Sequence, residues 1–442
     1  MIETKTKLQR YGKYVDSGVE WLGEIPKHWK MKKIKFLSDI FNGDSLNELL
    51  KKRYESDDLK DLAYISSKDI NVNNSEIAYE NGLRIPKEDF SLKIAPSNSS
   101  LLCIEGGSAG RKIAFTNQEV CFVNKLACFK IKGNNYSKYL FFSLKGSPFQ
   151  TQFKLSMTGM IGGVSISSIN NFCLPLPPLS EQTKIAQFLD DKTSKIDVAV
   201  TIKEQQINLL KERKQILIHK AVTQGLNPNV TLEDSGVEWI GEIPEGWEVK
   251  KLKYATRIFR GKFTHRPRND ERMYDGDYPF FQTGDVARAG KYLSGFIQTL
   301  NEKGLRVSTL FPKGTIVITI AANIGDISIL DIDACFPDSI VGFEPNDFIE
   351  KHFLYNTLLV MKEQFMSSTI KNTQMNLNVD RIGSNSIVVP SFSEQKKISV
   401  YIESASQKIE TAIRLKQQEI EKLKEYKSSL INSVVTGKVK VC

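Results

Sequence analysis

Two short stretches contain the residue types of phosphate-binding or catalytic sites. Residues 105–112, EGGSAGRK, are glycine-rich, but the P-loop spacing is absent and no Ser or Thr follows Lys112. Residues 336–345, FPDSIVGFEP, contain Asp338 and Glu344, two acids that could hold the metal of a nuclease, but no lysine stands beside Glu344. We interpret the first stretch as a glycine-rich turn that could present its basic residues to DNA, and the two acids as surface charges.

Methyl transfer and metal binding also lack their motifs. An adenine methyltransferase needs an Asn/Asp-Pro-Pro-aromatic motif, whereas Asn227-Pro228 is followed by Asn229, and no GxGxxG loop follows a strand. The six cysteines form no CxxC pair, which is typical of small buried side chains in a reducing cytosol. We therefore expect no catalytic residue and no metal site in this chain. The histidines lack metal-ligand spacing; they are His28, His219, His265 and His352.

The basic residues give a stronger signal. The formal net charge of +10 suits a polyanionic partner, and ordinary solubilising charge is the equal alternative on composition alone. Residues 250–272 contain nine Lys or Arg against two acids, interleaved with Tyr254, Phe259 and Phe263, which suits phosphate contacts and base-edge recognition. A solvated loop and a membrane surface are the alternatives. No apolar helical face accompanies the basic run and no apolar stretch of about 18 residues exists, so we expect no membrane partner.

Ten basic side chains from both halves of the chain are candidates for DNA contacts. Such side chains would neutralise phosphates, and a few would contact base edges. The candidates are Lys68, Arg111, Lys112, Lys125, Arg257, Arg260, Lys262, Arg266, Arg268 and Arg288.

The elements that must position these residues occur twice. Residues 16–35, DSGVEWLGEIPKHWKMKKIK, and residues 234–253, DSGVEWIGEIPEGWEVKKLK, are identical at 14 of 20 positions. A second pair of segments, 179–225 and 392–438, aligns without a gap at an offset of 213 residues, and both contain Ser-Glu-Gln near the start. The inserts between these segments have similar lengths but different sequences. This repeat predicts two similar units that share one frame and differ in surface.

Each long segment predicts one uninterrupted helix. Ser180 is the expected N-cap of the first, with Glu181 in the first turn. Apolar residues recur with heptad spacing, so we expect two rods of roughly 60 Å that pair antiparallel. A helical hairpin is the alternative, but a hairpin needs a short connection and here a whole insert intervenes. The predicted seam comprises Leu189, Ile196, Val200, Ile207, Leu210, Leu217, Ile402, Ile409, Ile413, Ile420, Leu423 and Leu430.

The inserts have the composition of strands and turns with short helices. The predicted strand regions are 100–106, 120–132, 314–330 and 334–345, and the predicted helical regions are 136–154 and 348–365. The same order of elements in both inserts favours one α+β fold with different surfaces. The first helix is followed by a short linker and the second motif, whereas the second helix is followed by the last residues of the sequence. A similar length precedes the first motif. The chain therefore resembles a circle cut once, and residues before the first motif should lie near the end of the second helix.

These residues resemble the specificity subunit of Type I restriction-modification systems. The resemblance is carried by residues 175–190, PLPPLSEQTKIAQFLD, by DSGVEWIGEIPEGW at 234–247, and by the tandem arrangement with two long helices. It covers essentially the whole chain. The implied fold class is α+β, with two target-recognition domains separated by two antiparallel coiled-coil helices in a pseudo-two-fold, circular arrangement. The expected boundaries are 1–29, 30–179, 180–224, 225–247, 248–392 and 393–438.

The resemblance also implies the partners. Each recognition domain would bind one half of a split double-stranded DNA site, and the helices would set the spacer and dock two modification subunits. Those subunits would use S-adenosylmethionine to methylate adenine, and restriction (motor-nuclease) subunits, which would use ATP and Mg²⁺, are a further partner. The chain itself would hold no cofactor and would act in the cytoplasm. The alternatives are a coiled-coil scaffold that binds no DNA, and an enzyme that acts alone.

Overall fold

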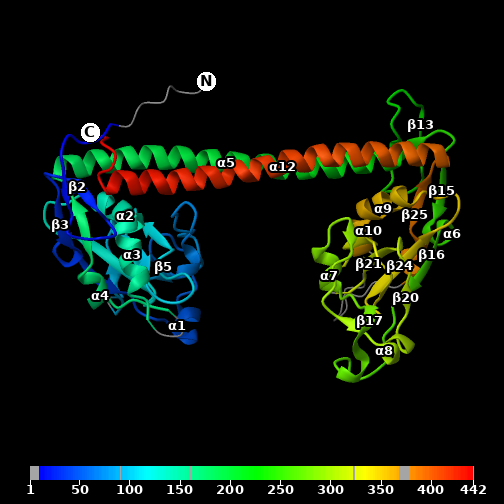
Figure 1. The fold of residues 1–442 in the computed structure, drawn as a ribbon, viewed down its shortest axis with the longest axis horizontal. Coiled ribbons are helices and arrows are strands. Elements are labelled where there is room, and N and C mark those ends of the chain that lie inside the picture. The colour runs from blue at the N-terminus through cyan, green and yellow to red at the C-terminus, as the bar shows by residue number, and fades with distance from the viewer. Residues whose placement is uncertain (1–8, 90, 159–161, 322–323, 368–378, 442) are drawn as a thin grey trace. The chain divides into compact units, whose positions relative to one another are not determined.

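The computed structural model describes residues 9–89, 91–158, 162–321, 324–367 and 379–441 (Figure 1). The chain divides into two compact units. Unit 1 comprises residues 1–204 and 417–442, and unit 2 comprises residues 205–416. The division passes through both long helices, because each helix segment packs on the insert of its own unit. The sequence-based boundaries, in contrast, separate whole helices from domains.

Each copy of the repeated motif, residues 16–29 and 234–247, is called the entry motif below. Two short strands form an antiparallel hairpin at each entry motif. In the first copy β1 (Tyr14–Asp16) pairs with β2 (Glu24–Pro26), and in the second β13 (Leu232–Asp234) pairs with β14 (Glu242–Pro244). The next strand pairs with the strand that precedes the long helix: β3 (Lys30–Lys33) with β12 (Cys173–Leu176), and β15 (Glu248–Lys251) with β25 (Ser386–Val389). Hairpin, ladder and long helix together are the repeated frame, and each insert begins and ends on its ladder.

The two long helices are α5 (Leu179–Gln224, 46 residues) and α12 (Phe392–Val435, 44 residues). The prediction that Ser180 caps α5 is wrong. The N–H of Glu181 already donates to the carbonyl of Pro178, so Ser180 lies inside the first turn. At the equivalent position of α12 (178 + 213 = 391), Ser391 accepts from the N–H of Glu394 at 3.3 Å, as an N-cap does.

Both helices end at a glycine against which an entry motif packs. Gly225 and Gly437 have φ of +74° and +72°, the left-handed conformation that closes a helix. A Cβ on Gly225 would lie 3.0 Å from Trp247, and one on Gly437 would lie 2.4 Å from Pro26 and 3.2 Å from Trp29. The first motif therefore packs on the end of α12, and the second packs on the end of α5.

The predicted proximity of the N-terminal segment to the end of α12 is confirmed. Gln9 forms an antiparallel bridge with Lys440, and the hydroxyl of Tyr14 donates to the carbonyl oxygen of Gly437 at 3.0 Å. Unit 1 is thus closed by residues from both ends of the described chain.

α5 and α12 run antiparallel within each unit (Figure 1). In unit 1, Asp197 lies opposite Lys427 and Lys203 pairs with Glu419 further along. In unit 2, Lys214 pairs with Glu410 at 2.6 Å. Seven predicted seam residues are buried and five are partly buried. The buried ones are Leu189, Ile196, Val200, Ile207, Ile402, Ile420 and Leu430, and the partly buried ones are Leu210, Leu217, Ile409, Ile413 and Leu423.

The insert of unit 1, called domain 1, is built on two four-stranded sheets. One has the order β4-β11-β8-β9, with bounds Ser38–Asn42, Leu126–Ile131, Ser100–Cys103 and Ile113–Phe115. The other has the order β6-β5-β10-β7, with bounds Arg84–Ile85, Leu62–Ile65, Val120–Phe122 and Ile94–Ala95. The helices are α1 (Glu48–Arg53), α2 (Ser137–Lys145), α3 (Ser147–Leu155) and α4 (Ile166–Asn170). Aromatic rings of α2 and α3 pack on the first sheet and on the start of α5 in one core.

The insert of unit 2, called domain 2, repeats the main sheet. Its order is β16-β24-β21-β22-β18, with bounds Thr256–Arg260, Ile340–Pro345, Ile316–Thr319, Ile327–Leu330 and Tyr292–Leu293. Two small ladders pair β17 (Tyr274–Pro279) with β19 (Thr299–Leu300) and β20 (Leu310–Phe311) with β23 (Ala334–Cys335). The helices include α6 (Leu252–Ala255), α7 (Thr283–Arg288), α8 (Glu302–Arg306), α9 (Lys351–Val360), α10 (Lys362–Ser367) and α11 (Val379–Ser384). Strands and helices occur in every region where the sequence predicted them.

The cysteines of the described residues are free, and most of them are buried. Cys103, Cys121, Cys128, Cys173 and Cys335 are free thiols, and burial raises the pKa of Cys121 and Cys128 to about 12, so neither is a reactive thiolate. Among the described residues, no helix combines the length and the apolar composition that crossing a bilayer requires.

Candidate nucleic-acid interface

In each domain, loops gather at one edge of the main sheet. The edge is the equivalent one in the two domains. In domain 1 it is the edge where β4 and β8 end and β11 begins; in domain 2, β16 and β21 end there and β24 begins. We call it the loop edge. Equivalent backbone bonds build it: the N–H of Ile104 donates to the carbonyl of Lys125 at 3.0 Å, and that of Ile320 donates to Ser339 at 2.9 Å.

A glycine makes each loop edge possible. Gly43 follows β4 and Gly261 follows β16, and at both points the chain passes directly over a neighbouring carbonyl. A Cβ would lie 1.8 Å from the oxygen of Phe122 in the first case and 2.2 Å from that of Pro337 in the second. The inserts therefore share a detailed backbone arrangement that their sequences barely reveal.

Four DNA-contact candidates meet at the loop edge of domain 1: Lys68, Arg111, Lys112 and Lys125. The carbonyl of Lys112 accepts from the N–H of Cys103 at the end of β8, while its ammonium donates to the carbonyl oxygen of Ser67, beside Lys68. The glycine-rich stretch 105–112 is the turn between β8 and β9, as predicted. Lys68, Arg111 and Lys125 are exposed, and their side chains form no hydrogen bond or ion pair with any residue the structure describes.

A cleft of about 420 Å³ opens beside this basic group. Its lining includes the polar residues Asn42, Glu105 and Ser165 beside the apolar residues Ile104, Val164 and Ile166. Glu105 bridges to Gly163 in backbone pairing, which fixes one wall. An amide, a carboxylate and a hydroxyl are the groups that pair with base edges in DNA.

The basic loop of domain 2 gathers around one acid. Asp338, in the connection that enters β24, accepts from Arg268 at 2.7 Å, and its backbone carbonyl accepts from Arg260. Arg266 donates to the carbonyls of Phe263 and His265, both at 2.8 Å. The loop edge of domain 2 therefore also carries a cluster of cations, formed by residues unrelated in sequence to those of domain 1.

The remaining candidates of domain 2 are placed differently. Arg257 pairs with Glu344 at 3.4 Å near the start of β16, and Arg288 pairs with Asp285 one turn away on α7 at 2.6 Å. Lys262 is exposed beside Gly261, with no side-chain hydrogen bond or ion pair to the described residues. The structure joins Arg260 and Arg268 but does not bring Arg257 or Arg288 into contact with them.

The two acids with nuclease potential are thus ion-paired with arginines. Asp338 faces Arg268 and Glu344 faces Arg257. Within the described part of the chain, no group of three or more His, Cys, Asp or Glu side chains is arranged to hold a metal ion.

Domain 2 contains an aromatic-floored pocket that the sequence did not indicate. It has a volume of about 240 Å³ and is lined by Phe263, Tyr274, Phe280, Arg268, Asn269, Gln282 and Gln298. The Phe263 and Phe280 ring centroids are 5.2 Å apart. The Gln282 amide donates to Gln298 at 3.4 Å, and both side chains are exposed. Three carboxamides beside an arginine can contact a base edge, but isolated Asn and Gln residues give no sequence signal for such a role.

The glutamine of each Ser-Glu-Gln motif attaches a domain to its helix. Gln182 is 2% exposed; its amide oxygen accepts from the N–H of Tyr136 at 2.9 Å and its amide nitrogen donates to Pro177. Gln395 is 0% exposed and accepts from the N–H of Glu350 at 2.7 Å. Its nitrogen likewise donates to a proline, Pro390, at 2.8 Å. The repeated motif was visible in the sequence, but this role was not.

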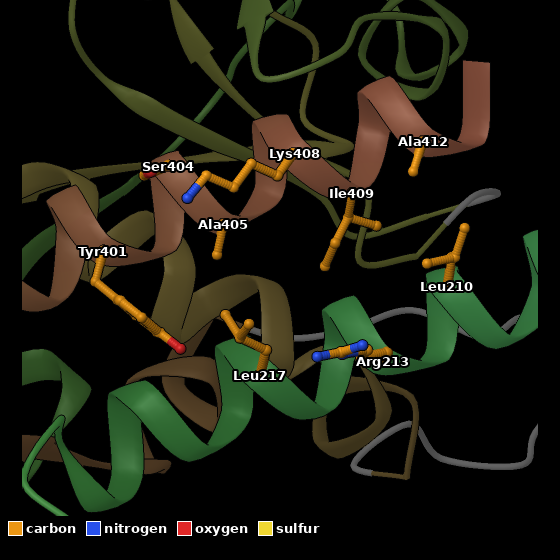
Figure 2. A pocket seen from close by; sticks show the side chains of 9 residues that line it. All are labelled: Leu210, Arg213, Leu217, Tyr401, Ser404, Ala405, Lys408, Ile409 and Ala412. Carbon is orange, nitrogen blue, oxygen red and sulfur yellow. The ribbon is translucent and has the colours of Figure 1, made fainter. Parts of the chain in front are cut away.

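A groove lies between α5 and α12 in unit 2. It has a volume of about 420 Å³ and apolar walls formed by Leu210, Leu217 and Ile409. Figure 2 shows Ile409 pointing into the space between the helices and Tyr401 extending from α12 toward α5. Small side chains at Ala405 and Ala412 leave the seam open there, so this stretch of the helix pair exposes apolar surface.

The repeated frame, the two domains with their loop edges and the two long helices define a class of two-domain proteins. Comparison of the sequence with known families assigns the chain to one such class. The chain matches the Type I restriction modification DNA specificity domain twice, over residues 26–211 and 244–425. It belongs to that family. The protein is thus a Type I restriction-modification specificity subunit with two target-recognition domains.

Curated relatives and solved structures span nearly the same length. The MjaVIII specificity subunit of Methanocaldococcus jannaschii is 26% identical over 390 residues, covering 85% of this chain and 84% of the relative. The EcoBI specificity subunit of Escherichia coli is 22% identical over 400 residues, covering 87% and 80%. A chain solved in a study of complex assembly and conformational transition of the type I R-M system superposes with a TM-score of 0.70 at 15% identity, covering 94% and 99%. The HsdS subunit from Thermoanaerobacter tengcongensis gives 0.51 at 16%, covering 94% and 98%.

Proposed function

We propose that each recognition domain of this specificity subunit binds one half of a bipartite double-stranded DNA site. One observation carries the proposal. The loop edges of the two domains are equivalent in backbone, and the two domains are built on the repeated frame. The basic and polar side chains at the two edges are unrelated in sequence. An equivalent backbone with different side chains suits a protein that uses one binding geometry for two DNA sequences.

Phosphate contacts supply most of the affinity in this account. In domain 1, Lys68, Arg111 and Lys125 have no side-chain partner among the described residues and can bind phosphates, and each neutralised phosphate releases counterions. In domain 2, Arg268 pairs with the Asp338 carboxylate and Arg260 donates to the Asp338 backbone carbonyl. A phosphate therefore competes with the carboxylate for Arg268 and with the carbonyl for Arg260. Binding therefore weakens as salt rises.

Base-edge contacts supply the specificity. The polar groups of the domain 1 cleft are Asn42, Glu105 and Ser165, and those of the domain 2 pocket are Asn269, Gln282 and Gln298. A carboxamide pairs well with adenine and a carboxylate with the amino group of cytosine. Each good pair contributes about 1–3 kcal/mol of discrimination against a wrong base.

The helix pair sets the distance between the half-sites, near one helical turn of DNA, or about 10 bp. It also docks two modification subunits, and the groove lined by Leu210, Leu217 and Ile409 is one surface for that contact. Those subunits bind S-adenosylmethionine and methylate adenine, and motor-nuclease subunits consume ATP with Mg²⁺. This chain contributes recognition and no chemistry, and the complex works in the cytoplasm.

A charge-matched pair of variants tests the assignment of the loop edge. The chain is co-expressed with its modification subunits, its methylated site is mapped, and duplex binding is measured against salt concentration. K68Q/K125Q removes two charges at the loop edge. The control K60Q/K87Q removes two exposed charges, one just before β5 and one just after β6, at the end of these strands away from Lys68. The first should lower the slope of log K against log salt by about 2, since each phosphate contributes about 0.9. The second should leave it unchanged.

Equal slopes for the two variants would place the interface elsewhere. Binding that does not depend on salt, or no DNA binding by the assembled complex, would favour a protein scaffold. Methylation by the purified chain alone would favour an enzyme.

A further inference from the structure

One residue of the helix pair reaches into domain 1. Lys427 of α12 is 8% exposed, and its ammonium has three acceptors. It donates to both carboxylate oxygens of Asp197 on α5, at 2.6 and 2.7 Å, and to the backbone carbonyl of Asn73 in domain 1 at 3.1 Å. An ammonium has three N–H donors, so all of them are satisfied at this junction.

The segment it holds, residues 71–76, is called the tip loop. The tip loop is closed by its own bonds: the N–H of Asn71 donates to Glu76 at 2.9 Å and that of Ser75 donates to Asn71 at 3.0 Å. A second lysine, Lys145 at the end of α2, donates to the Ser75 hydroxyl at 2.8 Å. The loop is thus held from α12 and from α2.

The tip loop is rigidly joined to the loop edge. Immediately before it, Ser66 and Asp69 form a capping box around the turn that carries Lys68. Ile70 is 1% exposed in the core, and the N–H of Ala78 donates to Asp69 at 2.8 Å across the base of the loop. The capping box, the buried Ile70 and this backbone bond thus connect the turn that carries Lys68 to the carbonyl that Lys427 holds.

The equivalent lysine of unit 2 makes no such connection. Lys214 corresponds to Lys427 (427 − 214 = 213), and Glu410 corresponds to Asp197 (410 − 197 = 213). Lys214 pairs with Glu410 at 2.6 Å, and no bond from its ammonium to domain 2 is found among the described residues. The Glu410 side chain is 61% exposed, against 28% for Asp197. Both units therefore contain this ion pair, and among the described residues only domain 1 has a loop bonded to its lysine.

We propose that Lys427 is a positioning residue for DNA recognition by domain 1: by holding the tip loop on the helix pair, it fixes the turn that carries Lys68. The proposal rests on the proposed function, since it gives Lys68 a DNA partner. Lys427 itself is buried and touches no DNA. Its effect reaches DNA through the placement of Lys68.

The first test concerns the full-length chain without DNA. Hydrogen exchange is measured over residues 66–78 in K427M and in the matched variant K214M. K427M should speed exchange in that segment, whereas K214M should leave it as in the unmodified chain. S75G is a milder second variant, because glycine accepts the positive φ of 63° at this position while losing the hydroxyl that Lys145 holds. It should produce a smaller change of the same kind.

The second test asks whether the connection acts through Lys68. Duplex affinity of the complex with modification subunits is measured for K427M, K68Q and the double variant. If Lys427 positions Lys68, the double variant loses no more affinity than the weaker-binding single variant, while K214M and K68Q combine additively. Additive losses for K427M and K68Q, or unchanged exchange in both K427M and S75G, would overturn the proposal. Failure of the unmodified complex to bind DNA would instead overturn the proposed function.

Discussion

The junctions of the two domains with the helix pair use the same frame positions in different ways. At the first equivalent pair, Asp190 and Glu403, both domains behave alike: Lys138 bonds Asp190 in unit 1 and Lys291 bonds Glu403 in unit 2. Two helical turns further on, at the positions of Asp197 and Glu410, they differ. There the tip loop covers the ion pair of unit 1, with side chains 10% and 28% exposed, whereas the pair of unit 2 is 27% and 61% exposed.

The frame and the insert therefore contribute different contacts between a domain and the helix pair. The frame supplies the contacts that any domain needs, such as Gln182 and Gln395, whose amides hold equivalent backbone groups. The insert decides how much further a domain is attached. Domain 1 is held at its ladder and also at a loop joined to its loop edge, so its recognition surface should move less against its helix segments.

The largest expected effect separates the spacer from the domains. Inserting one heptad after Glu204 and one after Gln417, its equivalent, keeps the seam in phase and lengthens the helix pair by about 10 Å. The half-site sequences should stay the same while the spacer grows by about 3 bp, at about 3.4 Å per base pair. Methylation mapping in cells checks both. Altered half-site bases would show that the helices take part in base recognition.

The next effect tests the two junctions directly. Asp197→Asn leaves the buried Lys427 ammonium without its counter-ion and should destabilise unit 1 locally by about 3–5 kcal/mol. Glu410→Gln breaks the equivalent but solvated pair and should cost about 0.2–1 kcal/mol. Hydrogen exchange of the flanking helix segments gives both values. Equal costs would mean that the tip loop does not shield the unit 1 pair.

The repeated glutamines should behave alike in the two units. Gln182→Leu and Gln395→Leu each orphan the buried backbone N–H at Tyr136 or Glu350, which costs about 1–3 kcal/mol. Local exchange of α2 and of α9 should rise by similar factors. A large effect in one unit alone would show that the frame is shared in sequence but not in energetics.

A further effect, on stability alone, concerns pH. Burial, with a contribution from the nearby Lys427 charge and against the opposing charge of Asp197, lowers the pKa of Lys145 to about 7 from its usual 10.5. Between these values the unfolded chain binds a proton that the folded chain does not, so the stability of unit 1 should rise as pH increases from 7 toward 10.5. Lys145→Met should remove that rise in urea unfolding of the full chain. An unchanged pH dependence would show that the ammonium stays hydrated.

The sequence predicted the elements that repetition or periodicity marks. The helices and their seam follow from heptad spacing and from the repeat at an offset of 213 residues, and the order of strands follows from the composition of the inserts. The start of α5 was wrong by one residue because the carbonyl of Pro178, and not the Ser180 side chain, begins the helix. The equivalence of Gly43 and Gly261 was missed, since close approach to a carbonyl is a tertiary property.

The candidate site was less predictable for a related reason. The basic composition of residues 250–272 pointed to the loop edge, but composition does not show which cations share a carboxylate. Arg268 pairs with Asp338, whereas Lys125 has no partner in the part of the chain that the structure describes. Polar side chains such as Gln282 come together only through the fold. The buried role of Lys427 was hidden because its sequence equivalent, Lys214, is an ordinary seam-flanking lysine.

Replacement of one insert tests whether each domain recognises its own half-site. Residues 30–179 are exchanged for the corresponding insert of a relative whose site is mapped, and genomic methylation is sequenced in cells that also express the modification subunits. One half-site should change to that of the donor, while the other half-site and the spacer should stay as they were. Changes in both half-sites, or in neither, would contradict the claim that two independent domains recognise DNA on one shared frame.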